Sequence, residues 1–455
     1  MEPNTEPTQS GERVSQGLHG VRERARKHKH ERFTALLHHV TPELLRASFF
    51  QLKKNAAPGV DGVTWKEYET GLAERLERLH GQVHRGAYRA QPSKRRWIPK
   101  ANGKLRPLGI AALEDKIVQQ AVVKVLNQIY EEDFLGFSYG FRPGRSQHQA
   151  LDALYVALKR KKVNWVLDID IKGFFDNLGK EHLIQMIERR IADPRILRLI
   201  RKWLDAGVME DGEWSETEVG VPQGAVASPL LANIYLHYVL DEWTVQWRRN
   251  AQGDVIIVRY ADDAIIGFQF ENEARRYLRQ LQKRLAEYGL ELNEDKTRLI
   301  RFGRFARLNR EERGEGKPES FQFLGFQHIC AENSLGRFEV RRITEGERRR
   351  KKLQEIKQQL RWRKHDPIAQ TGKWLRSVLQ GYFQYHAIPG NIGVLRRFGT
   401  KVARLWYRAL AQRSQRRPTW KKLGPIIASW LPSPHVLHEF PDARFDASRL
   451  AAHPR

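Results

Sequence analysis

The sequence contains one cysteine, Cys330, among 455 residues, and it has no apolar run long enough to cross a bilayer. A single thiol cannot close an intramolecular disulfide or supply a zinc site built on cysteine pairs. The longest apolar run, VASPLLANIYLHYVL at 226–240, is interrupted by Pro229, Asn233 and His237. The composition therefore favours a reducing compartment, and we expect no membrane partner.

Signals for export and for one large class of nucleotide-dependent enzymes are also missing. Residues 1–16 are polar and acidic, which is typical of neither a secretory signal nor an Arg-rich transit peptide. The sequence has no GxxxxGKS/T loop, no GxGxxG turn, no HExxH pair and no internal repeat. Hydrolysis of nucleoside triphosphates by a P-loop is therefore unsupported.

Acidic residues are scarce relative to basic ones, with 53 Asp and Glu against 80 Lys and Arg. The formal net charge of +27 predicts strong association with a polyanion, and nucleic acid is the first expectation. The alternative is a basic protein that is merely soluble, although so large an excess repels itself unless a partner neutralises it. Hydrophobic residues make up 40% of the chain, enough to build cores in about two to four domains.

The pattern of apolar residues predicts an α+β domain over 35–330, after a flexible basic leader at 1–34. Helical periodicity is found at 113–134 and 273–290, and the second segment ends at Gly289 as a helix ends at a C-cap. Strand-like runs are found at 163–171, 254–260 and 264–268.

Residues 331–425 differ in character from the preceding part. Between Arg341 and Trp420 there are 21 Lys and Arg against four Asp and Glu. We expect an all-α domain with one basic face, and its interleaved aromatic residues fit either a core or stacking on nucleic acid. Residues 426–455 are expected to form a Pro-rich tail. The helices expected in the all-α domain lie at about 346–362, 370–386 and 392–413.

The decapeptide RYADDAIIGF, at 259–268, places Asp262 and Asp263 side by side between β-prone apolar flanks. We expect a hairpin that carries both carboxylates at its tip. Because aspartate is also a common turn residue, the pair alone fits a purely structural turn equally well. The two charges repel each other, and Mg²⁺, which prefers carboxylate and phosphate oxygens, would reverse that repulsion.

A further carboxylate is available in VLDIDIKGFFDNL, at 166–178. Asp168 and Asp170 lie on one face of the expected strand, and Asp170 comes at its carboxyl end, just before a turn. Three carboxylates holding two metal ions could activate a primer 3′-hydroxyl and neutralise a leaving pyrophosphate. This combination is typical of a polymerase.

Seven segments in one order resemble the motifs of reverse transcriptases, specifically the group II intron-encoded reverse transcriptase/maturases. The resemblance covers about residues 50–330, and the basic region after 340 resembles the maturase (X) domain of this family. YADD alone is a weak signal, but the ordered set is specific. The segments are RRWIPKANGKLRPLGIAALEDKIVQQAV, SYGFRPGRS, DIDIKGFFDNL, GVPQGAVASPLLANIYL, YADD, LNEDKT and FLGF.

The resemblance implies that Asp170, Asp262 and Asp263 are the catalytic residues. They would bind two Mg²⁺ ions, for which Mn²⁺ is a substitute. Asp168 and Asp176 are left out of this set, and Asp176 fits a turn or cap before the following helix.

The resemblance also implies contacts with the substrates. Phe175, five positions after Asp170, is at the steric-gate position, where a ring would exclude a ribose 2′-hydroxyl. Alternatives stay open, because Lys104 could replace Lys100 and Phe175 could be a core residue. The residues implied for dNTP binding are Lys100, Arg106, Phe175, Gln223 and Lys296. Those implied for the primer grip, which could equally be core residues, are Phe323, Leu324, Gly325 and Phe326.

The implied fold is a right-hand polymerase, with fingers and palm at 35–330 followed by an all-α thumb or X domain at 331–425. The implied activity is RNA-directed DNA polymerisation that copies intron RNA during retrohoming, together with intron binding that assists splicing. The implied partners are group II intron RNA, an RNA template with a DNA primer, target DNA and dNTPs. We expect a bacterial cytoplasmic location, with nucleoid association when DNA is bound.

One departure from the family pattern concerns the endonuclease. Many relatives end in a domain with Cys pairs, whereas this sequence has one cysteine, so we expect the lineage without an HNH endonuclease. Two alternatives to the intron-encoded enzyme remain. One is a domesticated cellular reverse transcriptase in defence or repair, and the other is a non-catalytic RNA-binding splicing factor.

Overall fold

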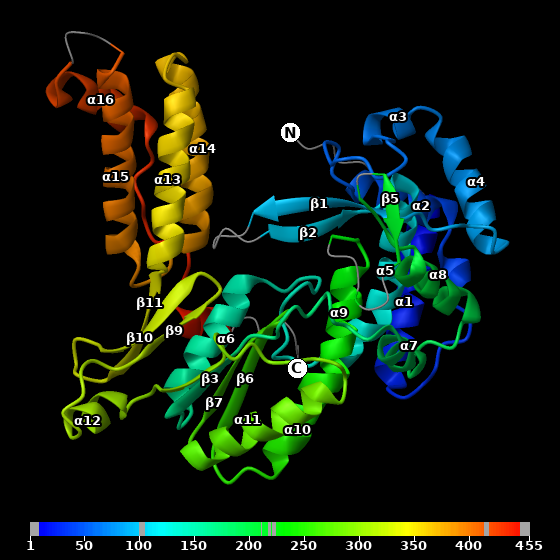
Figure 1. The fold of residues 1–455 in the computed structure, drawn as a ribbon, viewed down its shortest axis with the longest axis horizontal. Helices are drawn as coiled ribbons and strands as arrows, with labels where there is room; N and C mark the ends of the chain where they lie inside the picture. Colours follow the sequence, from blue (N-terminus) through cyan, green and yellow to red (C-terminus); the bar gives the residue numbers. More distant parts are fainter. Residues whose placement is uncertain are drawn as a thin grey trace.

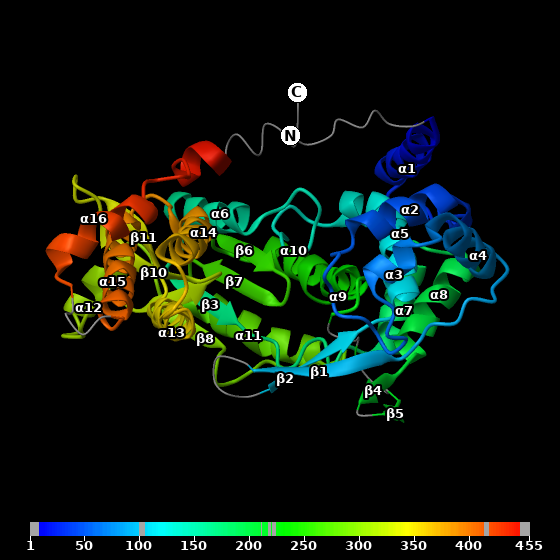
Figure 2. The same ribbon diagram turned by 90° about the horizontal axis from the view of Figure 1, so that it is seen from above.

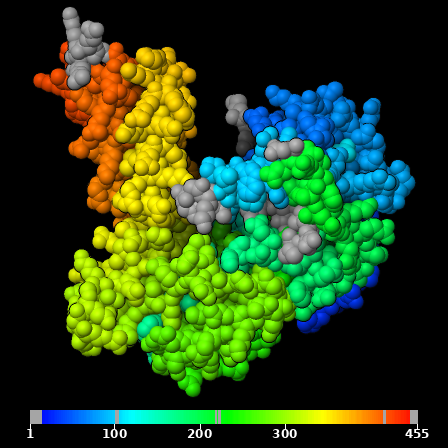
Figure 3. Space-filling view, viewed as in Figure 1, coloured from blue at the N-terminus to red at the C-terminus, as the bar shows by residue number. Residues whose placement is uncertain are grey.

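The computed structural model describes residues 9–99, 105–210, 212–216, 220, 224–413 and 418–445. Figure 1 shows a helical N-terminal part, a central sheet below it and an upright helical bundle on the opposite side. The space-filling view is hollowed between the bundle and the N-terminal part, above the central sheet (Figure 3). The fold is therefore mixed α and β, as the sequence predicts.

The central sheet has the strand order β6-β7-β3-β8 and is antiparallel throughout. Strands β3, β6 and β7 match the three runs expected from the sequence, whereas β8 was not expected. Side chains alternate between two buried faces, so that Leu167 and Ile266 pack in one core and Val166 and Ile265 in another. Burial on both faces explains the continuous apolar runs. The strands are β3 (Trp165–Ile169), β6 (Val255–Tyr260), β7 (Asp263–Phe268) and β8 (Arg298–Arg301).

Helices cover both faces of this sheet. Helix α11 (Glu271–Ala286) contributes Tyr277 and Leu281 to one core, and it is the helix expected over 273–290. Helix α6 (Gln147–Arg160) contributes Leu151 and Leu154 to the other. Next to α11 a continuous helical stretch is built from three segments: α9 (Ser228–Leu236), a π-helical turn η2 (His237–Asp241) and α10 (Glu242–Arg249).

The N-terminal part packs around α5 (Leu113–Asp133), the helix expected at 113–134, which is buried along most of its length. A hairpin of β1 (Ser93–Pro99) and β2 (Leu105–Ile110) leaves this part toward the helical bundle (Figure 1). It forms a sheet of order β2-β1-β4-β5 with β4 (Val208–Glu210) and β5 (Glu213–Ser215). The other elements here are α1 (Gln9–Lys27), η1 (Leu37–His39), α2 (Pro42–Gln51), α3 (Trp65–Glu69), α4 (Leu72–His84), α7 (Lys180–Glu188) and α8 (Pro194–Asp205).

A third sheet lies where the helical region was expected to have begun. Strand β10 (Phe326–Glu332) crosses residue 331 and another strand follows it, so the domain expected to be all-α over 331–425 begins with strands, and its first helix starts at Gly346, as predicted. The sequence RFEVRRIT hides its alternation because the charged Arg342 occupies a buried position, 3% exposed, two residues after Val340. The other strands of this sheet are β9 (Ser320–Phe323) and β11 (Phe338–Thr344), and the short helix α12 (Ala306–Glu311) precedes it.

The helical bundle has the three expected helices and one more. Helices α13 (Gly346–Trp362), α14 (Ile368–His386) and α15 (Ile392–Ala411) begin and end within two residues of their predicted positions. Helix α16 (Trp420–Trp430) was not expected beyond 413, and it contains Pro425. Trp406 is fully buried, in line with a core role, whereas Trp362 is 69% exposed, so the alternative of stacking on nucleic acid stays a prediction for it.

The segment after α16 returns to the central part of the molecule. Leu437 donates its amide to the Ala387 carbonyl at 2.9 Å, and seven residues later Arg444 binds Asp152 of α6. Asp152 is buried and also accepts from Arg342 of β11 at 3.2 Å. The tail therefore links the bundle to the central sheet (Figure 2). Among the described helices, none is long and apolar enough to cross a membrane.

Candidate active site

The YADD segment forms the hairpin predicted from its sequence. Tyr260 pairs with Asp263 across β6 and β7, which leaves Ala261 and Asp262 as a two-residue turn. Ala261 has φ +57°, in the left-handed region that an L-residue enters at a cost of about 1 kcal/mol. Both carboxylates therefore sit at the tip of the hairpin, where Asp262 is half-buried and Asp263 exposed.

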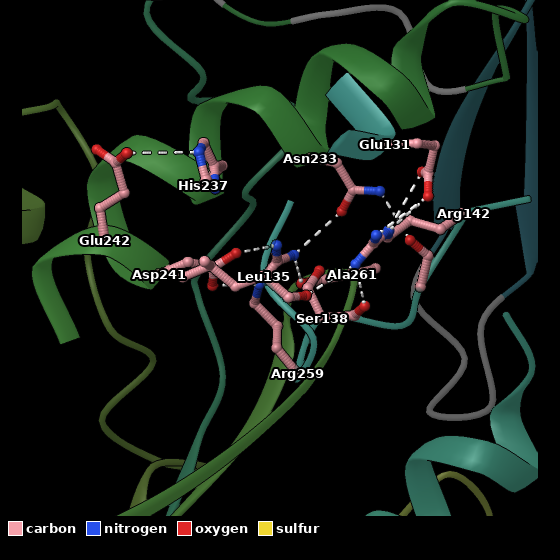
Figure 4. Close-up of polar contacts among 11 residues, drawn as sticks. Glu131, Leu135, Ser138, Arg142, Asn233, His237, Asp241, Glu242, Arg259 and Ala261 are labelled. Atoms are coloured by element: carbon pink, nitrogen blue, oxygen red, sulfur yellow. Dashed lines mark hydrogen bonds and ion pairs between the residues drawn. The ribbon is translucent and has the colours of Figure 1, made fainter. Parts of the chain in front are cut away.

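A fully buried guanidinium holds the backbone of this turn (Figure 4). Arg259 donates from Nη1 to the Ala261 carbonyl at 2.9 Å and to Asn233 Oδ1 at 3.1 Å. Its Nε and Nη2 donate to the two carboxylate oxygens of Asp241 at 2.7 and 2.5 Å. Asp241 is also fully buried, so removing one partner would leave an uncompensated charge, at a cost of about 3–5 kcal/mol.

The SYGFRPGRS motif supports the same turn from outside. The backbone of Arg259 is bonded on both sides, donating to the Phe137 carbonyl and accepting from the Tyr139 amide, each at 2.9 Å. A Cβ on Gly140 would lie 2.2 Å from the Ala261 nitrogen, so a side chain at this position is sterically excluded. Asn233 donates to the Gly140 carbonyl at 2.7 Å. The motif is thus part of the scaffold of the hairpin tip.

The third predicted carboxylate, Asp170, follows directly after β3, the strand paired with β7. Lys296 donates to both of its carboxylate oxygens at 3.1 and 3.0 Å. Asn293 Nδ2 donates to Asp170 Oδ2 at 3.0 Å, and the Asn293 amide donates to the Asp170 carbonyl at 2.8 Å. The LNEDKT segment therefore binds both the side chain and the backbone of Asp170. This contact was not predicted from the sequence.

The carboxylates influence one another electrostatically. Burial and then the Asp170 carboxylate raise the pKa of Asp262, while Arg106 opposes the rise. The protein packed around Asp263, followed by the charges of Asp262, Asp170 and Asp168, raises the pKa of Asp263 to about 6. These effects place the three predicted carboxylates in one acidic cluster.

Asp168, which the sequence prediction left out, belongs to this electrostatic cluster. Burial raises the pKa of Asp168 to about 6, the Asp170 charge adds to the rise, and Arg298 opposes it from 3.5 Å. Arg348, at the start of α13, opposes the raised pKa of Asp263. No sequence signal indicated Arg348, because it lies 85 positions from Asp263 and comes from the helical bundle.

The donor set has the chemistry of a magnesium site without a closed cage. Within the ranges the structure covers, no group of three or more His, Cys, Asp or Glu is placed to hold a metal ion by itself. Mg²⁺ commonly takes one or two protein carboxylates and completes its shell with waters and substrate phosphates. An open acidic tip fits that mode, in which Asp170 is paired here with the ammonium of Lys296.

The residues predicted to contact the dNTP are brought together in part. Arg106, exposed on β2, is close enough to affect Asp262. Phe175 is partly buried in the turn after Asp170, with its ring 5.3 Å from that of Phe174. Lys296 contacts Asp170, as described above. Lys100 and Gln223 fall outside the described residues, as does Lys104, the alternative to Lys100.

The four residues predicted for the primer grip form the turn between β9 and β10. Phe323 pairs with Phe326, which leaves Leu324 and Gly325 as a two-residue turn with φ +47° and +79°. Both phenylalanine rings are buried in the core, in line with the alternative that they are core residues. Tyr385 of α14 donates to the Leu324 carbonyl at 2.7 Å, so this turn joins the sheet to the helical bundle.

Comparison with known proteins gives a consistent picture. Residues 98–328 match the family model described as reverse transcriptase (RNA-dependent DNA polymerase). The chain is 36% identical over 275 residues to Protein YkfC of Escherichia coli (strain K12), covering 53% of this chain and 72% of that protein. It is 38% identical over 220 residues to the group II intron-encoded protein LtrA of Lactococcus lactis subsp. cremoris, covering 48% of this chain and 36% of LtrA.

A more distant relative is the mitochondrial nuclear intron maturase 4 of Arabidopsis thaliana. It is 29% identical over 141 residues, which is 30% of this chain and 17% of that protein. The chain thus spans about a third of the length of LtrA and less of this maturase.

The raised pKa of Asp263 makes the stability of the metal-free protein depend on pH. Its folded-state pKa of about 6 exceeds the ordinary value of about 4. Ionisation of Asp263 therefore costs no folding stability below about pH 4, and it lowers the free energy of unfolding increasingly between about pH 4 and pH 6. Because solvent reaches this side chain, we expect Asp263→Asn to stabilise the protein by only about 1 kcal/mol at pH 7.5. Near pH 4 the difference should vanish. Urea unfolding in EDTA at both pH values measures it.

Asp205→Asn, an exposed change at the end of α8, is the control: it removes a carboxylate that pairs with Lys180 at 3.3 Å, so it should lower stability slightly at pH 7.5 rather than raise it. An equal effect of Asp263→Asn at pH 4 and pH 7.5 would contradict the assigned electrostatic cluster.

Proposed function

The chain belongs to the reverse transcriptase (RNA-dependent DNA polymerase) family, and we propose that it is an RNA-directed DNA polymerase encoded by a group II intron. It copies intron RNA into DNA during retrohoming and binds that RNA to assist splicing. The observation that carries the proposal is the hairpin tip, which presents Asp262 and Asp263 within electrostatic reach of Asp170 inside the matched region.

In this proposal Asp170, Asp262 and Asp263 hold two Mg²⁺ ions. The ions supply Lewis-acid activation of the primer 3′-hydroxyl and stabilise charge on the leaving pyrophosphate. The protein contributes a fixed arrangement of carboxylates, because the buried Arg259 prevents the turn from relaxing. Such preorganisation matters because only correctly placed charges lower the barrier.

Cations surround the acidic tip and would act on the triphosphate. Arg106 would hold the triphosphate of the incoming nucleotide from strand β2, where a cation meets accumulating phosphate charge. Lys100 and Gln223, outside the described residues, are proposed by the resemblance alone to contact the same nucleotide. Lys296, which pairs with Asp170 in this structure, would donate a proton to the leaving pyrophosphate. Phe175 would lie against the sugar and exclude a 2′-hydroxyl.

The helical bundle fits a thumb that also binds RNA. Its helices α13 and α14 border the hollow opposite the β1–β2 hairpin (Figures 1 and 3). Helix α13 alone contains seven Lys and Arg in 17 residues, five of them exposed at the surface. We assign 35–330 to fingers and palm and the helices from Gly346 to a thumb or X domain. The flexible leader expected at 1–34 is wrong for its described part, because α1 packs against α5 and buries Val21 and Ala25. The tail expected from 426 begins later, because α16 extends to Trp430.

Catalysis by the three carboxylates is tested by Mg²⁺-dependent incorporation of dNTPs on an RNA template with a DNA primer. Asp262→Ala/Asp263→Ala should reduce the rate at least about 1,000-fold, because metal and charge stabilisation are lost together. The control Asp205→Ala should keep wild-type activity. Equal activity of the wild type and the double variant would remove the enzyme proposal. Intron RNA binding with no incorporation by the wild type would favour the non-catalytic splicing factor.

Sugar discrimination tests the position of Phe175. Phe175→Ala should raise the efficiency of rNTP incorporation relative to dNTP by about 10-fold or more, since the ring no longer collides with the 2′-hydroxyl. Phe175→Tyr keeps the bulk and should keep the preference. Single-nucleotide incorporation with matched dNTP and rNTP gives both ratios. Unchanged discrimination in Phe175→Ala would assign this ring to the core alone.

RNA binding by the bundle is tested on α13. Lys351→Ala/Lys357→Ala removes two exposed cations and should weaken intron RNA binding several-fold while lowering the salt slope by about 2. The control Arg279→Ala/Lys283→Ala removes two exposed cations from α11 and should change neither. These substitutions are preferable to truncation near residue 335, which would separate the paired strands β10 and β11. Equal salt slopes in all three proteins would contradict the assignment.

A further inference from the structure

Backbone strain is concentrated around the candidate active site. Of the non-glycine residues that the structure describes, three have φ in the left-handed region: Phe141 at +59°, Ala261 at +57° and Leu324 at +47°. Such conformations persist where the surroundings impose them, and they cluster at functional sites. All three lie at or beside the YADD hairpin, either in its turn, against its Tyr260, or in the neighbouring β9–β10 turn.

Phe141 is strained because both of its neighbours in the chain are fixed. Gly140 packs against the Ala261 backbone and accepts a hydrogen bond from Asn233. Arg142 is buried and donates to Glu131 and to the carbonyls of Leu135 and Ser138, the last two at 2.8 Å (Figure 4). The backbone between these anchors has no freedom to move Phe141 out of the left-handed region.

The strained backbone of Phe141 is not offset by burial of its side chain. Ala261 is a small turn residue, and Leu324 is buried at 9% exposure, so folding explains both. Phe141 is 51% exposed, and its ring lies 6.4 Å from that of Tyr260, the residue that precedes the catalytic turn. The left-handed backbone of Phe141 is strained, and its apolar ring is exposed to water. Both are unfavourable for the free protein, which indicates a partner outside the chain.

Resting on the polymerase function proposed above, we infer that Phe141 stacks against the 3′-terminal nucleotide of the primer and, with Tyr260, positions it beside Asp262 and Asp263. The primer strand is the one that must bring its 3′-hydroxyl to the hairpin tip, and Phe141 is adjacent to that tip. Every base offers a π-face, so an aromatic platform holds any primer end without reading its sequence. The strained loop keeps the ring fixed before the nucleic acid arrives.

The test measures binding without turnover. A primer with 2-aminopurine at its 3′ end, annealed to an RNA template, is titrated with protein in the absence of dNTPs. Phe141→Asn should weaken affinity for the primer end by about 5-fold to 100-fold and reduce the fluorescence change. Phe141→Tyr retains a ring and should bind as the wild type does. The matched control is Phe305→Asn, which also removes a ring 51% exposed but at an ordinary φ of −99° before α12.

Thermal unfolding separates stacking from a merely structural role. Asparagine enters the left-handed region more readily than phenylalanine, so Phe141→Asn should unfold at the same temperature as the wild type or higher. A lower unfolding temperature with unchanged primer affinity would overturn the inference, as would a fluorescence change confined to 2-aminopurine in the template. If the wild type incorporates dNTPs while Phe141→Asn holds the primer end normally, this inference alone fails. A wild type that neither binds primer nor incorporates dNTPs would overturn both.

Discussion

The buried pair of Arg259 and Asp241 is the interaction on which the rest of the site depends. Both groups are withdrawn from water, where an ion without its partner is strongly unfavourable, so the pair forms completely or the region does not fold. Forming it requires two stretches of chain to meet: strand β6, and the continuous helix that supplies Asn233 and, eight residues later in its π-helical turn, Asp241. One guanidinium thus ties together motifs that are separate in sequence, and the strained turn at Ala261 is the result.

Sequence periodicity predicted the elements whose partners are apolar. Three strands of the central sheet (β3, β6 and β7), the helices α5, α11 and α13 to α15, and the hairpin at Asp262 were predicted and found, because uniform burial leaves a regular pattern. Strand β11 was missed because Arg342 stands at a buried position, and its partner Asp152 lies 190 positions away. The same holds in the site: the local strand pattern predicted Asp170, whereas no local pattern could predict that Arg348 acts on Asp263.

The site is acidic although the chain as a whole carries a large excess of positive charge. A chain of net charge +27 gathers four carboxylates at one sheet end, and single cations from different elements face them. Arg298 comes from β8, Lys296 from the preceding loop, and Arg348 from α13. Of these cations, Arg298 and Lys296 belong to the central sheet and its adjoining loop, and Arg348 belongs to the helical bundle. Any displacement of the bundle alters the field at the hairpin tip, since Arg348 travels with it.

Asp152 gives the helical bundle a second attachment. The chain enters the bundle once, from β11 through Glu345, and it leaves after α16 to return along α14 to α6. Arg342 at the entry and Arg444 at the return grip the same carboxylate, on its two oxygens. The two arginines therefore fix the beginning and the end of the segment 342–444 to one buried carboxylate, so the part of the chain that contains the bundle forms a loop closed by Asp152.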